Sequence, residues 1–337
     1  MKICLIGTFS GNLDEGYRNV AFNLSKHLSK KHNIVNMDIT KIYSIHFWKQ
    51  IREFKPHIIH YLTAPTFLSF AILKIARIRC DFNVKLVMSS LHPYSLKILK
   101  NPLLKRMIKL MKPDLILTQC QIIKEILEEM GCKTGFLPNG VDTDRFVPAS
   151  EERKEKLREK YGVSKEKFVI LHVGHIRKMR GIKIFKKIQR ESKENQVIIV
   201  GSSFFKTDEK LFQDLIDSGC IVWKRYFKNI EEIYALADCY VFPVPIGESL
   251  FMPLSVLEAM SCNLPVLSTK FEGLVDNFDE GGGLMFFNNE TDLIAKLKEV
   301  KKGMFKPETR KKVLPYSWNN ICIKLEILYN NLLSISK

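Results

Sequence analysis

Short runs of apolar residues alternate with segments in which apolar residues recur every three or four positions, and this alternation continues along most of the chain. The apolar runs have the length of strands, and the segments between them have the spacing of amphipathic helices. Strands that alternate with helices form parallel βαβ units, because a parallel connection must be long enough to hold a helix. The pattern therefore predicts an α/β fold with parallel sheets.

The alternation falls into two successive sets, which indicates two Rossmann-like sheets in series. A chain of 337 residues is too long for one typical domain and comfortable for two. In the first half we predict strands at 2–6, 33–38, 57–61, 85–89, 115–118 and 135–137. In the second half we predict strands at 168–173, 197–200, 221–223, 239–242, 265–268 and 284–287. The segments 20–29, 253–260 and 319–333 have helical patterns.

A dense run of charged residues, 150–165, separates the two sets of strands. Its composition is typical of a solvated helix or a connector. We place the domain boundary there, with domains at 1–150 and 151–315, followed by a terminal helical segment at 316–337. Open parallel sheets bind ligands at the carboxyl ends of their strands, so two sheets that face each other across a cleft would share a ligand.

The chain carries a large positive charge. It has 53 Lys and Arg residues against 36 Asp and Glu residues, a net charge of +17. Residues 1–150 hold 22 of these basic residues and 11 of the acidic ones, so the excess lies mainly in the first half. Such a charge implies an anionic partner: phosphate groups, nucleic acid or an anionic membrane. No RNP, zinc-finger or helix-turn-helix pattern is present, so we do not expect nucleic acid as the partner.

The cysteines and histidines give no sign of a metal site. The eight cysteines are scattered, without a CxxC pair, and are expected to be free thiols in a reducing compartment. The eight histidines show no HExxH spacing. The opening apolar run ends at Gly7 and is too short for a signal peptide, and 67–78 is too short and too charged to span a bilayer. We therefore expect a cytoplasmic protein, soluble or peripheral on the membrane.

The segment from Val173 to Gly181, VGHIRKMRG, follows a predicted strand and precedes a helix. Gly174 at the strand end would let a ligand approach the backbone, and arginine side chains with helix amides favour a bound diphosphate. A basic turn without a ligand is the alternative. The position between strand and helix favours the ligand.

A second segment, 247–260, reads GESLFMPLSVLEAM. Pro253 suits the first position of a helix, which would place Glu258 in a largely apolar helix. A carboxylate there is costly without a partner. A ribose diol is one suitable partner because two hydroxyl groups can donate to two carboxylate oxygens, and a salt bridge to Arg or Lys is the other.

Two further segments follow strands of the first half. LPNGVDTDRF, 137–146, contains an Asn-Gly turn signal, and we favour a structural turn at the domain edge. His92 follows the strand at 85–89 and would lie at its carboxyl end. It could hydrogen-bond a sugar hydroxyl or a leaving phosphate, and a structural role is equally open.

Taken in order, these segments resemble the GT4 family of retaining GT-B glycosyltransferases. The resemblance covers almost the whole chain and rests on KPHIIHY, LPNGVDTDRF, VGHIRKMRG, LEAMSCNLPVLST and YSWNNI. Single pieces are weak, but three of them at matching separations are specific. The resemblance implies a GT-B fold, with an acceptor-side domain at 1–150, a nucleotide-sugar domain at 151–315 and a C-terminal helix at 316–337 that crosses back to the first domain.

The resemblance also implies roles for individual residues. Gly16 and Tyr17 lie in the loop after the first strand, which in the family approaches the donor phosphates. Arg180 takes the place of the family's diphosphate-binding Lys, and His175 stands where the family usually has Arg. These residues, with Gly174, form the expected phosphate site.

The remaining implied roles concern the sugar, the ribose and the base. His92 matches the family His near the transferred sugar, and Glu258 matches the ribose-binding second Glu of the E-x7-E motif. Backbone around Tyr226, within 223–227, is expected to contact the base.

One departure from the family pattern affects this site. The first Glu of the E-x7-E motif should fall at the position of Leu250, whereas Glu248 lies two residues earlier and Ser249 stands between them. Either the loop bulges so that Glu248 substitutes as a catalytic carboxylate, or the site lacks that group. The donor-binding set nevertheless includes Ser249 and Leu250.

We expect a metal-independent glycosyltransferase without a cofactor, which takes a sugar from a nucleotide-diphosphate donor. Cationic side chains and helix amides would stabilise the leaving diphosphate. A non-catalytic nucleotide-sugar-binding protein of the same fold is the alternative, suggested by Leu250. The stretch 96–112 has six basic residues, no acidic one and interleaved apolar residues. It predicts an anionic membrane surface as a partner and a lipid-linked or glycan acceptor, with a helix packed on the sheet as the alternative.

Overall fold

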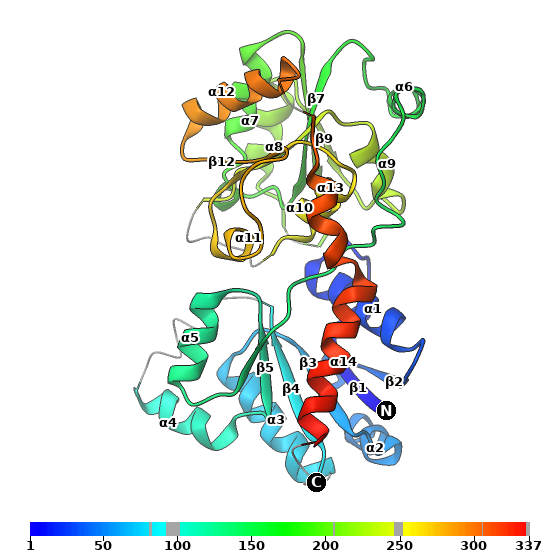
Figure 1. The fold of residues 1–337 in the computed structure, drawn as a ribbon, viewed down its shortest axis with the longest axis vertical. Coiled ribbons are helices and arrows are strands. Elements are labelled where there is room, and N and C mark those ends of the chain that lie inside the picture. Colours follow the sequence, from blue (N-terminus) through cyan, green and yellow to red (C-terminus); the bar gives the residue numbers. More distant parts are fainter. Residues whose placement is uncertain (81–82, 92–101, 205, 246–251, 305, 335–337) are drawn as a thin grey trace. The chain divides into compact units, whose positions relative to one another are not determined.

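The computed structural model describes residues 1–80, 83–91, 102–204, 206–245, 252–304 and 306–334, except for the side chain of Leu104. Within them the chain divides into two compact units (Figure 1). The first comprises Met1–Gly140 and Trp318–Lys337, and the second comprises Val141–Ser317. The division falls at Gly140, before the boundary that we placed in the charged run.

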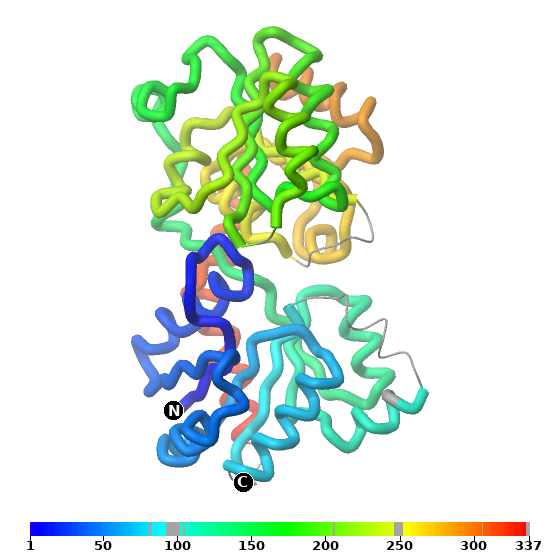
Figure 2. The backbone as a smooth tube through the Cα atoms, turned by 180° about the vertical axis from the view of Figure 1, so that it is seen from behind, coloured from blue at the N-terminus to red at the C-terminus, as the bar shows by residue number. Residues whose placement is uncertain are grey.

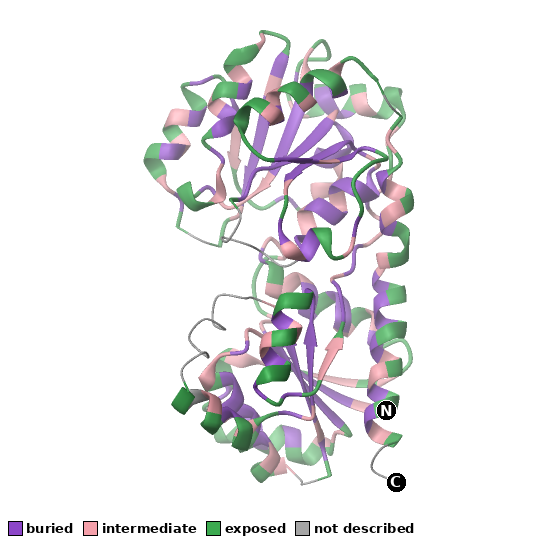
Figure 3. Ribbon diagram, turned by 60° about the vertical axis from the view of Figure 1, so that its left-hand side comes forward, coloured by how far each residue is buried: buried purple, intermediate pink, exposed green. Residues whose placement is uncertain are grey.

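The first unit is built on a six-stranded parallel sheet of order β2-β1-β3-β4-β5-β6. The four central strands are nearly continuous apolar runs and are buried on both faces, as expected for a parallel sheet covered by helices, whereas the two edge strands are only partly buried (Figure 3). The bounds are β1 (Lys2–Gly7), β2 (Asn33–Asp38), β3 (Ile58–Thr63), β4 (Lys85–Ser90), β5 (Leu115–Thr118) and β6 (Thr134–Phe136).

Six α-helices of the first unit lie within the described residues, together with a 3-10 turn, η1 (Ile39–Lys41). They are α1 (Gly16–Leu28), α2 (Ile45–Phe54), α3 (Phe67–Cys80), α4 (Pro102–Met111), α5 (Gln121–Glu129) and α14 (Trp318–Ser334). The C-terminal α14 packs beside α1, so the last segment of the chain lies against the first helix (Figure 2). In the same unit α2 packs against α3, and α3 against α4.

A buried polar chain fastens α14 to the sheet. His60 on β3 is fully buried, and its two ring nitrogens contact the hydroxyl groups of Tyr329 at 2.6 Å and Ser89 at 2.7 Å. Burial lowers the pKa of His60 to about 3, so the imidazole is neutral. Gly140 packs against the ring of Trp318, and a Cβ there would lie 2.5 Å from a ring carbon. This close approach gives the Asn-Gly motif a structural reason for its glycine.

The second unit contains a six-stranded parallel sheet of order β12-β11-β10-β7-β8-β9. The bounds are β7 (Phe168–Gly174), β8 (Asn195–Gly201), β9 (Ile221–Lys224), β10 (Cys239–Phe242), β11 (Val266–Thr269) and β12 (Leu284–Phe287). The helices are α6 (Glu151–Lys160), α7 (Ile184–Glu191), α8 (Glu209–Ile216), α9 (Ile230–Ala235), α10 (Leu254–Ser261), α11 (Glu272–Val275), α12 (Glu290–Lys301) and α13 (Thr309–Val313), with the 3-10 turns η3 (Lys178–Arg180) and η4 (Leu314–Tyr316).

Two apolar clusters fill the two faces of this sheet. One packs α7, α8 and α12 against the strands, and the other packs α6, α9, α10 and α13. The charged run forms α6, which is capped by the Ser150 side chain. The helix is not fully solvated, because Arg158 is buried and donates to Asp238 at 2.6 Å and to the carbonyl of Leu236 at 3.0 Å. That pair anchors α6 to the start of β10.

The cysteines are free thiols, as predicted. All eight lie within the described residues without a disulfide, and all are buried except the half-buried Cys80. Burial raises the pKa of Cys220 and Cys322 to about 12, so these thiols are protonated and unreactive.

Candidate functional site

The strand order of the second unit marks one edge of its sheet for ligand binding. From β7 the chain first proceeds to β8 and β9 on one side, then returns to β10, β11 and β12 on the other. Ligands of open parallel sheets bind where this order reverses, outside the carboxyl ends of the two strands. In this unit the reversal lies between β7 and β10. The segments that follow these strands are those singled out from the sequence for Gly174, Arg180 and Glu248.

The loop after β7 packs on the backbone that follows β10. Gly174 ends β7 in register with Gly201 at the end of β8, and Arg180 lies in η3. Gly181 has a left-handed conformation with φ of 70°, and a Cβ there would lie 2.0 Å from the carbonyl oxygen of Pro243. A side chain at this position would force the two segments apart. Glycine therefore brings the Arg180 loop against the segment that leads to residues 246–251.

A neutral histidine lies beneath this loop. His172 is 1% exposed, and its Nδ1 donates to the carbonyl of Val241 at 2.9 Å. Burial, with a smaller effect of the Arg180 charge, lowers the pKa of His172 to about 4. A Cβ atom on Gly174 would lie 3.0 Å from the Nε2 atom of His172. The imidazole places an acceptor nitrogen below Gly174, and Arg180 supplies positive charge nearby.

Glu258 lies on α10 and is partly exposed. Its Oε2 accepts a hydrogen bond from the hydroxyl group of Tyr234 at 2.8 Å. Glu258 makes no ion pair with any Arg or Lys in the described part of the chain. The alternative of a structural salt bridge at Glu258 is therefore wrong for the described residues. Burial raises the pKa of Glu258 to about 7, although the Tyr234 hydrogen bond and the Arg145 charge oppose this rise. The carboxyl group is therefore poised to change charge near neutral pH.

Two stacked tyrosines link Glu258 to the end of β7. The hydroxyl group of Tyr240 donates to the carbonyl of Val173 at 3.2 Å, directly before Gly174. The Tyr240 ring stacks on Tyr234 at a centroid distance of 5.9 Å. Tyr234 in turn donates to Glu258. The second unit thus brings the Gly174 end of β7 and Glu258 into one continuous set of contacts.

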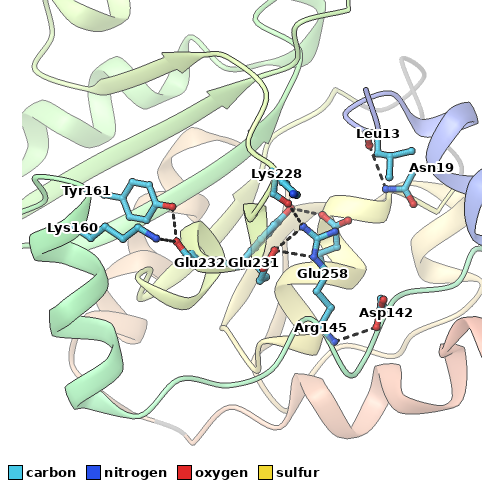
Figure 4. Close-up of polar contacts among 11 residues, drawn as sticks. Leu13, Asn19, Asp142, Arg145, Lys160, Tyr161, Lys228, Glu231, Glu232 and Glu258 are labelled. Atoms are coloured by element: carbon cyan, nitrogen blue, oxygen red, sulfur yellow. Dashed lines mark hydrogen bonds and ion pairs between the residues drawn. The ribbon is translucent and has the colours of Figure 1, made fainter. Parts of the chain in front are cut away.

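Three residues around Glu258 were not among the predicted site residues. Tyr234 is its hydrogen-bond donor, and Arg145 and Glu231 form an ion pair at 2.6 Å beside it (Figure 4). Arg145 belongs to LPNGVDTDRF, which we interpreted as structural. Its one sequence signal was a basic residue in a segment that recurs in the resembled family.

The family resemblance predicts that Gly16 and Tyr17 lie in a loop. This is wrong, because they form the first turn of α1. The carboxylate of Glu15 caps this helix and accepts from the amides of Tyr17 and Arg18 at 3.0 Å each. The cap satisfies the amide donors locally and so extends the helix back to Gly16. Those two amides already have an acceptor.

Of the remaining predicted residues, Tyr226 is described and four others are not. Tyr226 follows β9, and its side chain is 37% exposed. His92, Glu248, Ser249 and Leu250 lie outside the described residues. Among the residues that are described, no group of three or more His, Cys, Asp and Glu side chains could hold a metal ion. Nor does any helix in that part of the chain have the length and apolar character needed to cross a membrane.

The two sheets, with a candidate site at the switch point of the second, define a protein of the GT-B fold class. Solved structures agree on the fold: Alr3699/HepE of Anabaena, solved in complex with UDP, aligns with a TM-score of 0.76 at 15% identity and covers 98% of this chain and 100% of that one. A sucrose-phosphate synthase of Thermosynechococcus elongatus aligns with a TM-score of 0.77 at 15% identity, covering 99% and 100%.

Family models identify both halves of the chain. Residues 32–145 match the model described as Glycosyltransferase Family 4, and residues 153–316 match Glycosyl transferases group 1. The chain belongs to the GT4 family of glycosyltransferases, as the sequence motifs predicted.

Curated relatives are distant and longer. The sulfoquinovosyl transferase SQD2 of Arabidopsis thaliana is 27% identical over 77% of this chain and 52% of that protein. The alpha-galactosylglucosyldiacylglycerol synthase of Streptococcus pneumoniae is 30% identical over 40% of this chain and 37% of that protein. The matched region spans about half the length of SQD2 and 37% of the length of the synthase.

Proposed function

We propose that the chain is a retaining glycosyltransferase that transfers a sugar from a nucleotide-diphosphate donor without a metal ion. The observation that carries the proposal is the contact chain from Gly174 through Tyr240 and Tyr234 to Glu258, at the switch point of the second sheet. It provides a glycine backbone near a cationic loop at one end and a carboxylate at the other. A nucleoside diphosphate needs both, one for the pyrophosphate and one for the ribose diol.

In this proposal each group acts on a different part of the donor. Arg180 neutralises the charge that develops on the leaving diphosphate, in the role that a metal has in other transferases. Glu258 in its ionised form accepts hydrogen bonds from the ribose hydroxyls. The Gly174–His175 backbone allows close approach of the phosphates, and backbone near Tyr226 contacts the base. His92 and Glu248 would act at the transferred sugar.

Two measurements test the reaction. Thermal-shift titration with UDP, GDP and ADP sugars identifies the donor, because a ligand that binds the native state raises the unfolding midpoint. Transfer or hydrolysis of that donor, measured with and without EDTA, then tests catalysis and its independence of metal. Proton NMR of the product reports the anomeric configuration. Binding without turnover would favour a nucleotide-sugar-binding protein, and an inverted product would contradict retention.

We also propose that the first unit docks on an anionic membrane, where the acceptor is lipid-linked or part of a glycan. On α4 the apolar side chains of Leu103, Met107 and Leu110 are 69%, 41% and 75% exposed and recur on one helical face. The neighbouring α3 exposes Ile75 and Ile78 to 43% and 63%.

The positive charge of α3 and α4 favours an anionic membrane as the partner of this surface. Helices α3 and α4 together contain six basic residues and no acidic one: Lys74, Arg77, Arg79, Lys105, Arg106 and Lys109. Exposed apolar tips framed by cations fit the interface of a bilayer with anionic lipids, at about 1 kcal/mol for each basic residue near the surface. Two of the relatives are named as diacylglycerol glycolipid synthases. Co-sedimentation with phosphatidylglycerol vesicles at low and high salt tests the docking, and no binding at low salt would contradict it.

A further inference from the structure

Arg145 joins three segments of the second unit beside Glu258. Its main-chain amide donates to the Asp142 side chain at 3.1 Å, which closes the turn after Val141. Its guanidinium donates through Nε to Glu231 at 2.8 Å and through Nη2 to the main-chain carbonyl of Lys228 at 2.6 Å. Figure 4 shows this side chain reaching the start of α9, with Glu258 next to it.

These contacts fix the turn between β9 and α9. One planar guanidinium binds a carbonyl of the turn and a carboxylate of the helix that follows, so neither can shift without breaking a charge-assisted hydrogen bond. The Arg145 and Glu231 side chains are 35% and 20% exposed, so water reaches the pair and its net strength is modest. Its effect is expected in geometry and local charge more than in global stability.

The pair also faces Glu258 with opposite charges. The charge of Arg145 lowers the pKa of Glu258 and the charge of Glu231 raises it. Among the described residues, Tyr234, Tyr240 and Cys262 are further titratable groups that interact with this carboxyl. Arg310 on α13 is a nearby cation whose guanidinium donates to carbonyls of the second unit.

We propose that Arg145 and Glu231 are positioning residues for the nucleoside half of the donor. They hold the turn after β9 and set the charge next to Glu258, so that base and ribose are bound together. This inference rests on the proposed function, because it takes Glu258 as the group that binds ribose. It assigns a binding role to an arginine of the LPNGVDTDRF segment.

The neighbouring residue on α9 provides a matched control. Glu232 accepts from Lys160 at 2.5 Å and from the hydroxyl group of Tyr161 at 2.6 Å, so it also forms an ion pair with hydrogen bonds. It faces α6 instead of Glu258 (Figure 4). Glu231→Gln and Glu232→Gln remove the same charge from consecutive positions of one helix.

The experiment measures nucleotide affinity by calorimetry from pH 5.5 to 8.5. The probe is whichever of UDP, GDP and ADP binds the wild-type protein most tightly, with its 2′,3′-dideoxy counterpart as a second ligand. The variants are Arg145→Lys, Arg145→Gln, Glu231→Gln, Glu232→Gln and Glu258→Gln. Circular dichroism checks folding, and if Arg145→Gln does not fold, Arg145→Lys and Glu231→Gln still decide.

Arg145→Gln is expected to weaken ribonucleotide binding about tenfold, equivalent to one lost charge-assisted hydrogen bond, and to move the pH midpoint of binding upward. Glu231→Gln is expected to move this midpoint downward. Arg145→Lys keeps the charge and therefore the pH midpoint of binding. It weakens binding because an ammonium group cannot reproduce the planar pair of hydrogen bonds to Glu231 and Lys228. Glu232→Gln should match the wild-type protein in affinity and midpoint.

Two failures are distinguishable. If Glu258→Gln retains the wild-type preference for ribose over dideoxyribose, the proposed function fails at Glu258. If Glu258→Gln loses that preference while the Arg145 and Glu231 variants behave like Glu232→Gln, the proposed function survives and the positioning role is overturned.

Discussion

The two units share one architecture but differ in the segment that follows their first strand. Each has six parallel strands, and each order reverses once, at β1/β3 in the first unit and at β7/β10 in the second. After β1 the carboxylate of Glu15 occupies the amides that open α1. After β7 the chain instead forms a basic loop held against Pro243 by Gly181.

Topology therefore marks a possible site, and local side chains decide its ligand. A carboxylate cap competes with a phosphate for the same amides and repels it. An arginine loop attracts the phosphate. We therefore expect the second unit to bind the donor phosphates and the basic helices of the first unit to bind another anion, the membrane surface. The predictions below test this division of labour.

The largest effect is expected for Arg180→Ala. Removal of a cation that stabilises a leaving diphosphate should lower turnover by roughly 100-fold to 1,000-fold. Steady-state kinetics with the identified donor measures the loss. Lys187→Ala, which removes the same charge from an exposed position of α7, is the control and should keep the wild-type rate. A rate near wild type in Arg180→Ala would end the phosphate role.

A second prediction concerns the membrane surface of the first unit. Leu103→Asn with Leu110→Asn removes two exposed apolar side chains from α4 and should weaken vesicle binding about tenfold or more, since each buried leucine contributes roughly 1.5–3 kcal/mol. Nucleotide binding should not change. The matched control, Ile323→Asn with Ile327→Asn, alters exposed apolar residues of α14 in the same unit. Equal losses in both double variants would indicate unfolding or unspecific adhesion.

Gly181→Ala tests the loop contact in the second unit. A Cβ there meets the Pro243 carbonyl oxygen at 2.0 Å in a left-handed backbone, so we expect a loss of more than about 1–2 kcal/mol in the free energy of unfolding and weaker nucleotide binding. Gly162 has φ of 65° with no heavy atom near its Cβ position. Gly162→Ala should therefore show the backbone strain alone and leave binding intact. Chemical denaturation and calorimetry separate the two effects.

The smallest effect concerns the pH dependence of stability. Folding raises the pKa of Glu258 from an ordinary 4.5 to about 7, so its native state keeps a proton that the unfolded chain releases. The contribution of this carboxyl group to the free energy of unfolding therefore falls as pH rises from about 4.5 through 7. The full shift corresponds to about 3 kcal/mol, and the partial exposure of Glu258 reduces the effect. Glu258→Gln cannot ionise and should therefore gain on the order of 1 kcal/mol relative to wild type at pH 8 compared with pH 4. Urea denaturation at both pH values measures it, and a constant difference would contradict the shifted pKa.

Some of the strands could be predicted to the residue, as at Leu115–Thr118 and Cys239–Phe242, because a buried parallel strand is a contiguous apolar run. Helix starts were less certain. The structure begins α1 at Gly16 and not at Val20, since its cap is a glutamate and its first turn is polar. Pro253 precedes α10 in an extended conformation instead of opening it.

Sequence alone determined the alternation of strands and helices, the two sheets, the basic first half and the family, because each depends on local periodicity or on short motifs. Tertiary structure decided which distant residues surround Glu258: Tyr234 by its hydroxyl group, Arg145 and Glu231 by their charges. These contacts connect positions far apart in the chain, and their geometry follows from how strands are ordered and helices pack, which no local pattern specifies.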